Sequence, residues 1–338
     1  MTQTYRIAVI GGDGIGPEVT GAALEVVRAA GVAIEDTSYD LGAARFLRDG
    51  FVLDDATLEE LRGFDAIMLG AVGPAIGDTR IPGGTLERGL LLKMRFGLDL
   101  YVNYRPFRGV PGSLAEGCEF AIVRENTEGP YAGEGGQLRR GTPHEIATQG
   151  SVNTRFGVER CVRYAFARAE SARVPRLTLV HKTNVLTFAG DLWSRVVNEV
   201  ATEYPNVEVD YHHVDAACIY LVENPQRYSV IVTDNLFGDI LSDLAGAVSG
   251  GIGYAASANL NPDRTGASLF EPVHGAAHDI VGQNRANPLA AVSSAALMLE
   301  HLGEIEAARR VEAVVRGFNA DPVVLGTSGI VKTLLESL

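Results

Sequence analysis

Short apolar, β-branched runs alternate along the chain with longer stretches that have helical character. Runs of the first kind are typical of buried strands. The expected strands cover 7–10, 33–38, 65–69, 101–106, 120–124, 177–180, 207–211 and 229–233. The expected helices lie near 18–30, 54–62, 85–96, 154–170 and 188–202, after 234–235, and near 288–301, 304–318 and 328–337. Strands interleaved with helices predict an α/β fold with an open, mostly parallel sheet flanked by helices.

Three glycine-rich or irregular segments interrupt this alternation. Residues 72–84 are expected to form a loop over the carboxyl ends of strands, where ligands bind in open α/β sheets. Residues 129–141 predict a hairpin or projecting arm, and residues 254–287 are expected to be a long loop.

The turn Gly11–Glu18 joins an expected strand to an expected helix. Pro17 suits a first helical turn and Glu18 complements the helix dipole. The dinucleotide fingerprint G-x-G-x-x-G does not fit, because counting from Gly12 puts Pro17 at its last position and counting from Gly11 puts Asp13 at its third. We therefore expect a strand–helix turn that lines a cleft, and not an ordinary Rossmann site.

Composition limits the function classes. The chain has 338 residues, enough for two domains or one large α/β unit. Its net charge of −13 argues against a nucleic-acid partner, because phosphate binding needs a basic face. Cys118, Cys161 and Cys218 lack metal-ligand spacing and fit a reducing compartment. With no signal peptide or membrane span visible, we expect a cytoplasmic protein without a membrane partner.

An acidic pair marks the helix expected after the strand at 229–233. Asp234 and Asn235 are candidate N-caps, and Asp239 and Asp243 stand four residues apart, so both carboxylates project from one face. The bland interpretation is a solvated acidic face. The apolar neighbours of the pair instead favour a site for Mg²⁺ or Mn²⁺, which prefer carboxylate oxygens.

Cationic side chains lie at strand ends. Arg95, Arg105 and Arg124 are individually typical of surface ion pairs, but together they predict a dicarboxylate site, because guanidinium binds carboxylate in bidentate fashion. Lys182 follows another strand, a position from which a lysine can point into a cleft. Asp215 also follows a strand and is a candidate third carboxylate around a cation.

Several strings together resemble one enzyme family. The matching strings are 12–18, 103–106, 124–129, 181–184, 234–243 and 271–275. They are similar, in the same order, to those of the β-decarboxylating dehydrogenases, which act on isopropylmalate, isocitrate, homoisocitrate or tartrate. The resemblance covers nearly the whole chain and is nearest to the members that act on 3-isopropylmalate.

The resemblance implies two α/β domains with a cleft between them. Residues 1–102 plus 255–338 would form the first, NAD-binding domain, and residues 103–254 the second, with the metal site, the arm and a homodimer interface. The implied reaction is the NAD-dependent oxidative decarboxylation of 3-isopropylmalate to 4-methyl-2-oxopentanoate in leucine biosynthesis, with Mg²⁺ or Mn²⁺ as the cation.

The resemblance also assigns roles to residues. Arg95, Arg105 and Arg124 match the arginines that hold the malate carboxylates, and Tyr131 and Lys182 match the acid–base pair. The metal ligands would be Asp215, Asp239 and Asp243, with Asp215 also near the substrate and with Lys182 and Asp215 supplied by the partner subunit. The NAD adenosine would be held by His274, Gly275, Ala276, Ala277, Asp279, Ile280 and Asn287.

Substrate choice is expected to depend on the segment 87–95. Leu91 and Leu92 would cover an alkyl group, where isocitrate enzymes hold a third carboxylate with serine and asparagine; the alternative is that both leucines belong to the core. Burying an isopropyl group contributes about 1.5–3 kcal/mol. Glu87 is expected near the nicotinamide, and Asp279 favours NAD because a carboxylate repels a 2′-phosphate.

Departures from the family pattern keep alternatives open. Residues 276 and 278 are alanine and histidine where serine and proline are usual, and the loop 74–84 is atypical. Tyr104 replaces a common leucine and would narrow or polarise the pocket of a tartrate or malate enzyme. The remaining alternatives are another 3-substituted malate, homoisocitrate, a silent regulatory subunit, or a non-redox dicarboxylate-binding protein.

Overall fold

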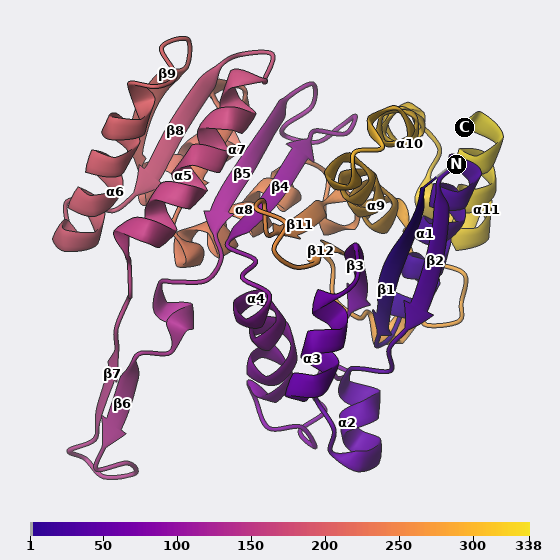
Figure 1. Cartoon of the computed structure of the whole chain (residues 1–338), viewed down its shortest axis with the longest axis horizontal. Coiled ribbons are helices and arrows are strands. Elements are labelled where there is room, and N and C mark those ends of the chain that lie inside the picture. The colour runs from indigo at the N-terminus through magenta and orange to yellow at the C-terminus, as the bar shows by residue number, and fades with distance from the viewer. Residues whose placement is uncertain (1–2) are drawn as a thin grey trace. The chain divides into compact units, whose positions relative to one another are not determined.

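The computed structural model describes residues 3–338. The chain divides into two compact units (Figure 1). Unit 1 comprises Met1–Leu100 and Gly251–Leu338, and unit 2 comprises Tyr101–Gly250. The boundaries expected from the sequence were 102/103 and 254/255.

Unit 1 is built on a five-stranded stretch of sheet in the order β2-β1-β3-β12-β11. β1 pairs in parallel with β2 and β3, β3 pairs in parallel with β12, and only β11 is antiparallel to its neighbour β12. The strands are β1 (Thr4–Gly12), β2 (Ala33–Ser38), β3 (Ala66–Ala71), β11 (Ala256–Leu260) and β12 (Ser268–Pro272). The helices are α1 (Gly16–Ala29), α2 (Ala43–Asp49), α3 (Asp55–Arg62), α4 (Lys93–Gly97), α9 (Leu289–Leu302), α10 (Ile305–Gly317) and α11 (Pro322–Ser337).

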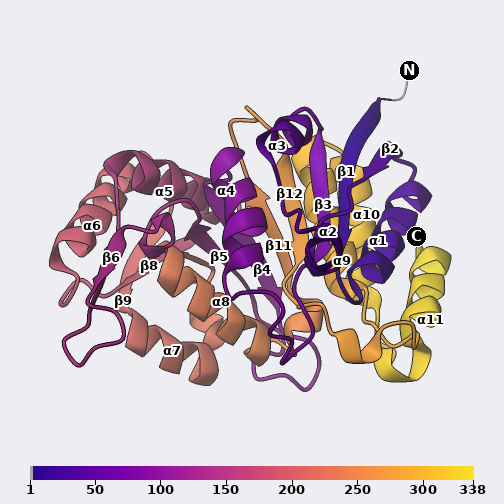
Figure 2. The same ribbon diagram turned by 90° about the horizontal axis from the view of Figure 1, so that it is seen from below.

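Unit 2 contains strands in the order β4-β5-β10-β8-β9. All neighbours are parallel except β4 and β5. The strands are β4 (Val102–Arg108), β5 (Glu119–Glu125), β8 (Arg176–His181), β9 (Glu208–His213) and β10 (Val230–Thr233). The helices are α5 (Arg155–Glu170), α6 (Thr187–Ala201), α7 (Val214–Glu223) and α8 (Asn235–Val248). Figure 2 shows α5 and α6 on one side of β8 and α7 and α8 on the other.

The register of unit 2 aligns the carboxyl ends of its parallel strands. Thr233 of β10 lies opposite Arg124 of β5 and Val180 of β8, and His181 lies opposite His213 of β9. Residues that immediately follow these strands therefore reach the same edge of the sheet, which is where ligands bind in parallel α/β proteins.

The expected α/β class with a mostly parallel sheet and flanking helices is confirmed. The expectation of a loop through 254–287 was wrong, because β11 and β12 lie within it. These strands carry buried polar residues such as Ser257 and Asn259, so the apolar runs that signal a strand are absent. Two short helices, α2 and α7, were also not predicted.

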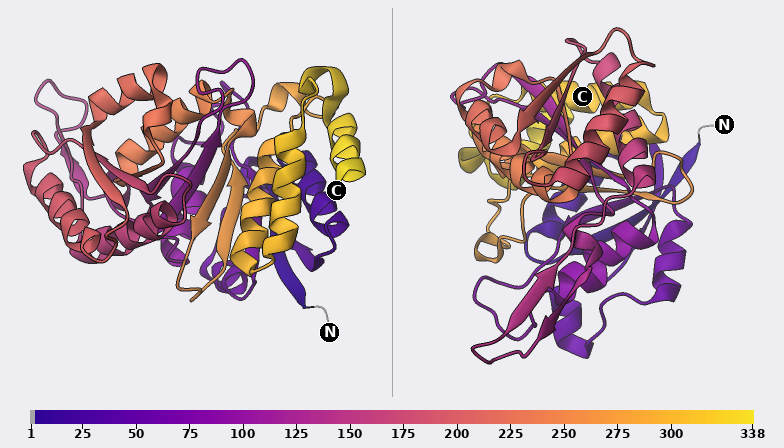
Figure 3. Two further views of the ribbon diagram at one scale, coloured as in Figure 1. Left: turned by 90° about the horizontal axis from the view of Figure 1, so that it is seen from above. Right: turned by 90° about the vertical axis from the view of Figure 1, so that its left-hand side faces the viewer.

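The segment after Gly129 forms the expected projecting arm. Its strands β6 (Gly135–Leu138) and β7 (Ile146–Gln149) pair with each other in a separate antiparallel sheet. Every residue of both strands is exposed, and the two-stranded arm extends away from the helices of its own unit (Figure 3). Within residues 3–338 no helix is long and apolar enough to cross a bilayer.

Candidate active site

The helix α8 begins directly after the buried strand β10. The Asp234 carboxylate accepts a hydrogen bond of 2.8 Å from the Phe237 amide, the N-cap that the sequence predicted. Its other oxygen lies 3.3 Å from Nε2 of the buried His181. This cap fixes the start of α8 and therefore the direction in which Asp239 and Asp243 project.

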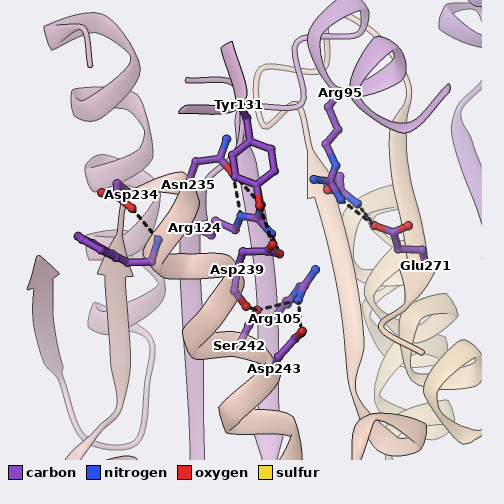
Figure 4. A network of polar contacts seen from close by, with 12 residues as sticks. Arg95, Arg105, Arg124, Tyr131, Asp234, Asn235, Asp239, Ser242, Asp243 and Glu271 are labelled. Carbon is purple, nitrogen blue, oxygen red and sulfur yellow. Dashed lines mark hydrogen bonds and ion pairs between the residues drawn. The ribbon is translucent and has the colours of Figure 1, made fainter. Parts of the chain in front are cut away.

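Arg124 crosses from β5 to α8 and is 1% exposed. Its Nε and Nη2 donate to Asn235 Oδ1 at 2.9 and 2.7 Å, and its Nη1 pairs with Asp239 (Figure 4). Gly238 makes room for this crossing, because a Cβ there would lie 2.5 Å from Arg124 Cγ. The buried guanidinium thus has a partner for each of its nitrogens, which offsets its desolvation.

Tyr131 belongs to the same cluster. Its hydroxyl donates to Asp239 Oδ2 over 2.6 Å, and the Arg124 guanidinium carbon lies 5.1 Å from the centre of its ring. The expected acid is therefore a direct neighbour of an expected metal ligand.

Arg105 reaches α8 one turn further on. From β4 it donates through Nη1 to Ser242 Oγ at 2.6 Å, and the same nitrogen lies 3.5 Å from Asp243 Oδ1 (Figure 4). Two guanidinium charges therefore face two carboxylates along one face of α8. We call Arg105, Arg124, Tyr131, Asp239 and Asp243 the α8 cluster.

Lys182 and Asp215 form a second group. Lys182 follows β8, Asp215 lies in the first turn of α7, and Lys182 Nζ donates to Asp215 Oδ1 at 2.7 Å. The lysine holds the pKa of the Asp215 carboxyl below its usual value. Within the described chain, residues 3–338, no three His, Cys, Asp or Glu side chains are grouped to hold a metal ion, and this holds for Asp215, Asp239 and Asp243.

The position of Tyr104 bears on the alternative in which this side chain lines the substrate pocket. Because side chains alternate along a strand, it points to the face of β4 opposite Arg105. It is buried, accepts a hydrogen bond of 2.8 Å from Arg168, and lies edge-on to Tyr164 of α5. The idea that Tyr104 narrows or polarises a substrate pocket beside Arg105 was therefore wrong.

Unit 1 carries the remaining substrate candidates. Arg95 lies in α4, with Nη2 3.6 Å from Glu271 Oε1. Glu87, Leu91 and Leu92 lie in a π-helical turn, Glu87–Leu92, that leads into α4. Glu87 is exposed, Leu92 is half-buried, and Leu91 is half-buried against the core of unit 1. Leu91 therefore has the core contact that the alternative interpretation required.

The expected adenosine-binding residues lie on one surface segment of unit 1. Asp279, Gly275 and Ala277 are exposed, Ile280 and Asn287 are half-buried, and Ala276 is buried. His274 has its pKa lowered by burial. Its Nε2 is buried and has no hydrogen-bond partner among the residues that the structure describes.

The glycines of the 11–16 turn are used for backbone packing. A Cβ at Gly12 would lie 2.1 Å from Ala71 O, one at Gly14 would lie 1.8 Å from Ala276 O, and one at Gly16 would lie 2.1 Å from Gly11 O. The turn thus packs against the protein's own backbone, in agreement with the failed dinucleotide fingerprint.

Sequence reasoning missed several supporting residues. Ser242 binds Arg105, Glu271 contacts Arg95, and Asp13 accepts amide hydrogen bonds from three residues in other segments. Ser242 follows Asp239 by three positions, which places it on the same helix face and was a usable signal. No local sequence pattern predicts the three amide groups that donate to Asp13.

Comparisons with known proteins identify the family. The family model described as isocitrate/isopropylmalate dehydrogenase matches residues 6–327. A protein of Corynebacterium diphtheriae named 3-isopropylmalate dehydrogenase is 60% identical over 315 residues, covering 92% of each chain. One of Frankia casuarinae with the same name is 56% identical over 328 residues, covering 96% of this chain and 95% of the relative. The crystal structure of isocitrate dehydrogenase from Methylococcus capsulatus is 38% identical, with a TM-score of 0.86 over 98% of this chain and 99% of that chain. The chain therefore belongs to the isocitrate/isopropylmalate dehydrogenase family.

Proposed function

We propose that the chain is an NAD-dependent enzyme that oxidises and decarboxylates 3-isopropylmalate to 4-methyl-2-oxopentanoate, a step of leucine biosynthesis, in the cytoplasm. The observation that carries this proposal is the α8 cluster, in a chain whose relatives at 56% and 60% identity bear the corresponding name. The cluster pairs groups that recognise an anionic substrate with groups that bind a cation.

Arg105 and Arg124 are proposed to bind the substrate carboxylates, together with Arg95 of unit 1. Both arginines of the α8 cluster are buried and held by fixed partners, so their guanidinium groups are preorganised. A planar guanidinium matches a carboxylate with two parallel hydrogen bonds.

Asp239 and Asp243 are proposed to hold Mg²⁺ or Mn²⁺. Their donor set fits, because both are carboxylates on one helix face and the half-exposed Asp239 and exposed Asp243 are accessible. When bound, the cation supplies Lewis-acid charge beside the substrate oxygens. Asp215 is proposed as a further ligand.

NAD is proposed to bind the segment 274–287 of unit 1. The buried, unpartnered His274 Nε2 and the exposed Asp279 carboxylate fit a polar ligand with ribose hydroxyls. When bound there, NAD⁺ would supply the hydride acceptor. Glu87 is proposed to lie towards its nicotinamide end.

Lys182 and Tyr131 are proposed to move the protons. Lys182, directly or through a water, takes the proton of the C2 hydroxyl as the C2 hydrogen leaves with its electron pair to NAD⁺. The bond between C3 and its carboxylate then breaks, CO₂ departs, and the electron pair remains as an enolate. Tyr131 gives C3 a proton, which balances the proton taken from the C2 hydroxyl, so the products are the 2-oxo acid, CO₂ and NADH.

The active form is proposed to be a homodimer, with Lys182 and Asp215 of one subunit completing the α8 cluster of the other. The supporting observation is that the neighbouring helices α7 and α8 expose large apolar side chains, Ile219 and Val222 on α7 and Leu236 and Ile240 on α8. Exposed apolar side chains that gather on one face are typical of an interface. The exposed arm offers a second element for a partner to cover.

The test is NADH formation with Mn²⁺ or Mg²⁺, with 3-isopropylmalate, isocitrate, tartrate and malate at equal concentration. We expect strong preference for 3-isopropylmalate, since Leu91 and Leu92 offer no charge to a third carboxylate. Preference for another substrate would keep the reaction class and overturn this pocket assignment. No turnover with any of them, despite NAD binding, would favour a silent subunit.

A further inference from the structure

The segment 274–280 is held to the rest of unit 1 at two points. The Ile15 amide donates to the Ala276 carbonyl at 2.8 Å, and Gly14 permits this close approach because it has no Cβ. Two residues later, His278 Nε2 lies 2.8 Å from the Gly73 carbonyl oxygen. Because a carbonyl only accepts, the proton in this hydrogen bond belongs to His278 Nε2.

Gly73 is itself held from its other side. Its amide donates to Asp13 Oδ2 at 3.0 Å, and the Asp13 carboxylate also accepts from the amides of Ala43 and Ala44 at 2.7 and 3.0 Å. Asp13 is buried, so this anchor is shielded from water. The His278 hydrogen bond therefore ends on a fixed point rather than on a free loop.

Ala277 lies between the two anchors in the left-handed region, with φ 39°. A residue with a Cβ adopts this conformation only at an energetic cost, so neighbouring contacts must maintain it. The Ala276 and His278 hydrogen bonds are those contacts. Asp279, whose carboxylate is proposed to contact the NAD ribose, directly follows His278.

We propose that His278 is a positioning residue of the coenzyme site. Its hydrogen bond to Gly73 fixes the segment 274–280 in the conformation that presents Asp279 to the adenosine ribose of NAD. This inference rests on the proposed function, because it assumes that NAD binds this segment. His278 is exposed, so its side chain contributes little to the core and its loss acts on the segment itself.

The experiment compares His278→Ala and His278→Gln with the unmodified protein. NAD affinity is measured by titration calorimetry and by the NAD-dependent rise in melting temperature, and KM for NAD and kcat are measured with 3-isopropylmalate. The glutamine amide retains a donor for Gly73, whereas alanine removes it. Arg309→Ala, at an exposed side chain of α10 in the same unit, is the control.

We expect His278→Ala to raise Kd and KM for NAD about two- to tenfold, the usual effect of losing one hydrogen bond, while kcat changes less. His278→Gln should recover most of the affinity, and 3-isopropylmalate binding should not change. Unaltered NAD affinity in His278→Ala, with normal binding by the unmodified protein, would overturn this inference alone. Failure of the unmodified protein to bind NAD would overturn the proposed function and this inference together.

Discussion

Arg124 shows why a buried charge is tolerated beside β10. Its nitrogens are divided between the Asn235 amide oxygen and the Asp239 carboxylate, so burial does not leave a donor unsatisfied. The sequence predicted Arg124 as a carboxylate ligand and Asn235 as a helix cap. It did not predict that Asn235 also orients Arg124, because that contact spans 111 positions.

Asp239→Asn tests the cation assignment. Removing the charge weakens a cation ligand and also takes a partner from Arg124 and Tyr131. We expect metal-dependent turnover to fall at least about tenfold and the half-saturating Mn²⁺ concentration to rise. Asp191→Asn, at an exposed carboxylate of α6, is the control. Unchanged metal dependence in Asp239→Asn would show that Asp239 is not a ligand of the cation.

Glu125 gives unit 2 a pH-dependent stability. Burial raises its pKa from 4.5 to about 6 and outweighs the opposing hydrogen bonds from Thr127 and Glu128. The folded state thus binds the proton more tightly than the unfolded state. The resulting stabilisation is complete below about pH 4.5 and is lost as the pH rises through about 6.

The free energy of unfolding should therefore fall by about 2 kcal/mol from pH 4.5 to pH 7, relative to Glu125→Gln, which does not titrate. Denaturant unfolding at several pH values measures this difference. Glu170→Gln, at an exposed position of α5, should follow the unmodified protein. Parallel pH profiles for Glu125→Gln and the unmodified protein would contradict the assignment.

Elements with strong local signals were predicted well, and elements whose burial depends on distant partners were not. The cap and face of α8 follow from spacing alone. β11 and β12 escape prediction because their buried polar residues are satisfied from elsewhere, as when Ser268 accepts from the Asn261 amide and Asn259 donates to Glu271. The direction of Tyr104 similarly depends on which face of β4 is covered by α5.

The exposed apolar side chains of α7 and α8 are proposed to form the dimer interface. Val222→Asp places a charge in the exposed apolar surface of α7 and should convert the proposed dimer to monomer, because burying an unpaired carboxylate is costly. Sedimentation velocity measures the change. Val174→Asp is the control. Val174 is about as exposed as Val222, at 46% against 41%, but it lies outside both helices. An unaltered dimer in Val222→Asp would exclude this surface as the interface.

At the scale of the whole molecule, ordered motifs identified the family, and the comparisons confirmed that identification. The proposed sharing of site residues between two subunits does not follow from the structure of one chain. The pairing of Lys182 with Asp215 and the separate α8 cluster give it a direct test, because each group can be inactivated by itself.

Lys182→Ala and Asp239→Asn should each have strongly reduced activity alone. When both chains are co-expressed, a mixed dimer with shared sites contains one site that carries both changes and one that carries neither. Random association should therefore restore about a quarter of the activity. If every site were built from one chain, no activity would return.

The resting state of the α8 cluster has a consequence for ligand entry. Arg105 is paired with Asp243, and Arg124 is paired with Asp239. A cation that binds alone must therefore compete with the guanidinium groups for the carboxylates. A substrate dianion that binds alone must compete with the carboxylates for the guanidinium groups. When both ligands bind, the cation takes the two carboxylates and the substrate takes the two guanidinium groups. Thermodynamic linkage then requires Mn²⁺ to tighten 3-isopropylmalate binding and the substrate to tighten Mn²⁺ binding by the same factor. Calorimetric titration of each ligand with and without the other measures both factors, and independent binding would show that the ion pairs persist in the loaded site.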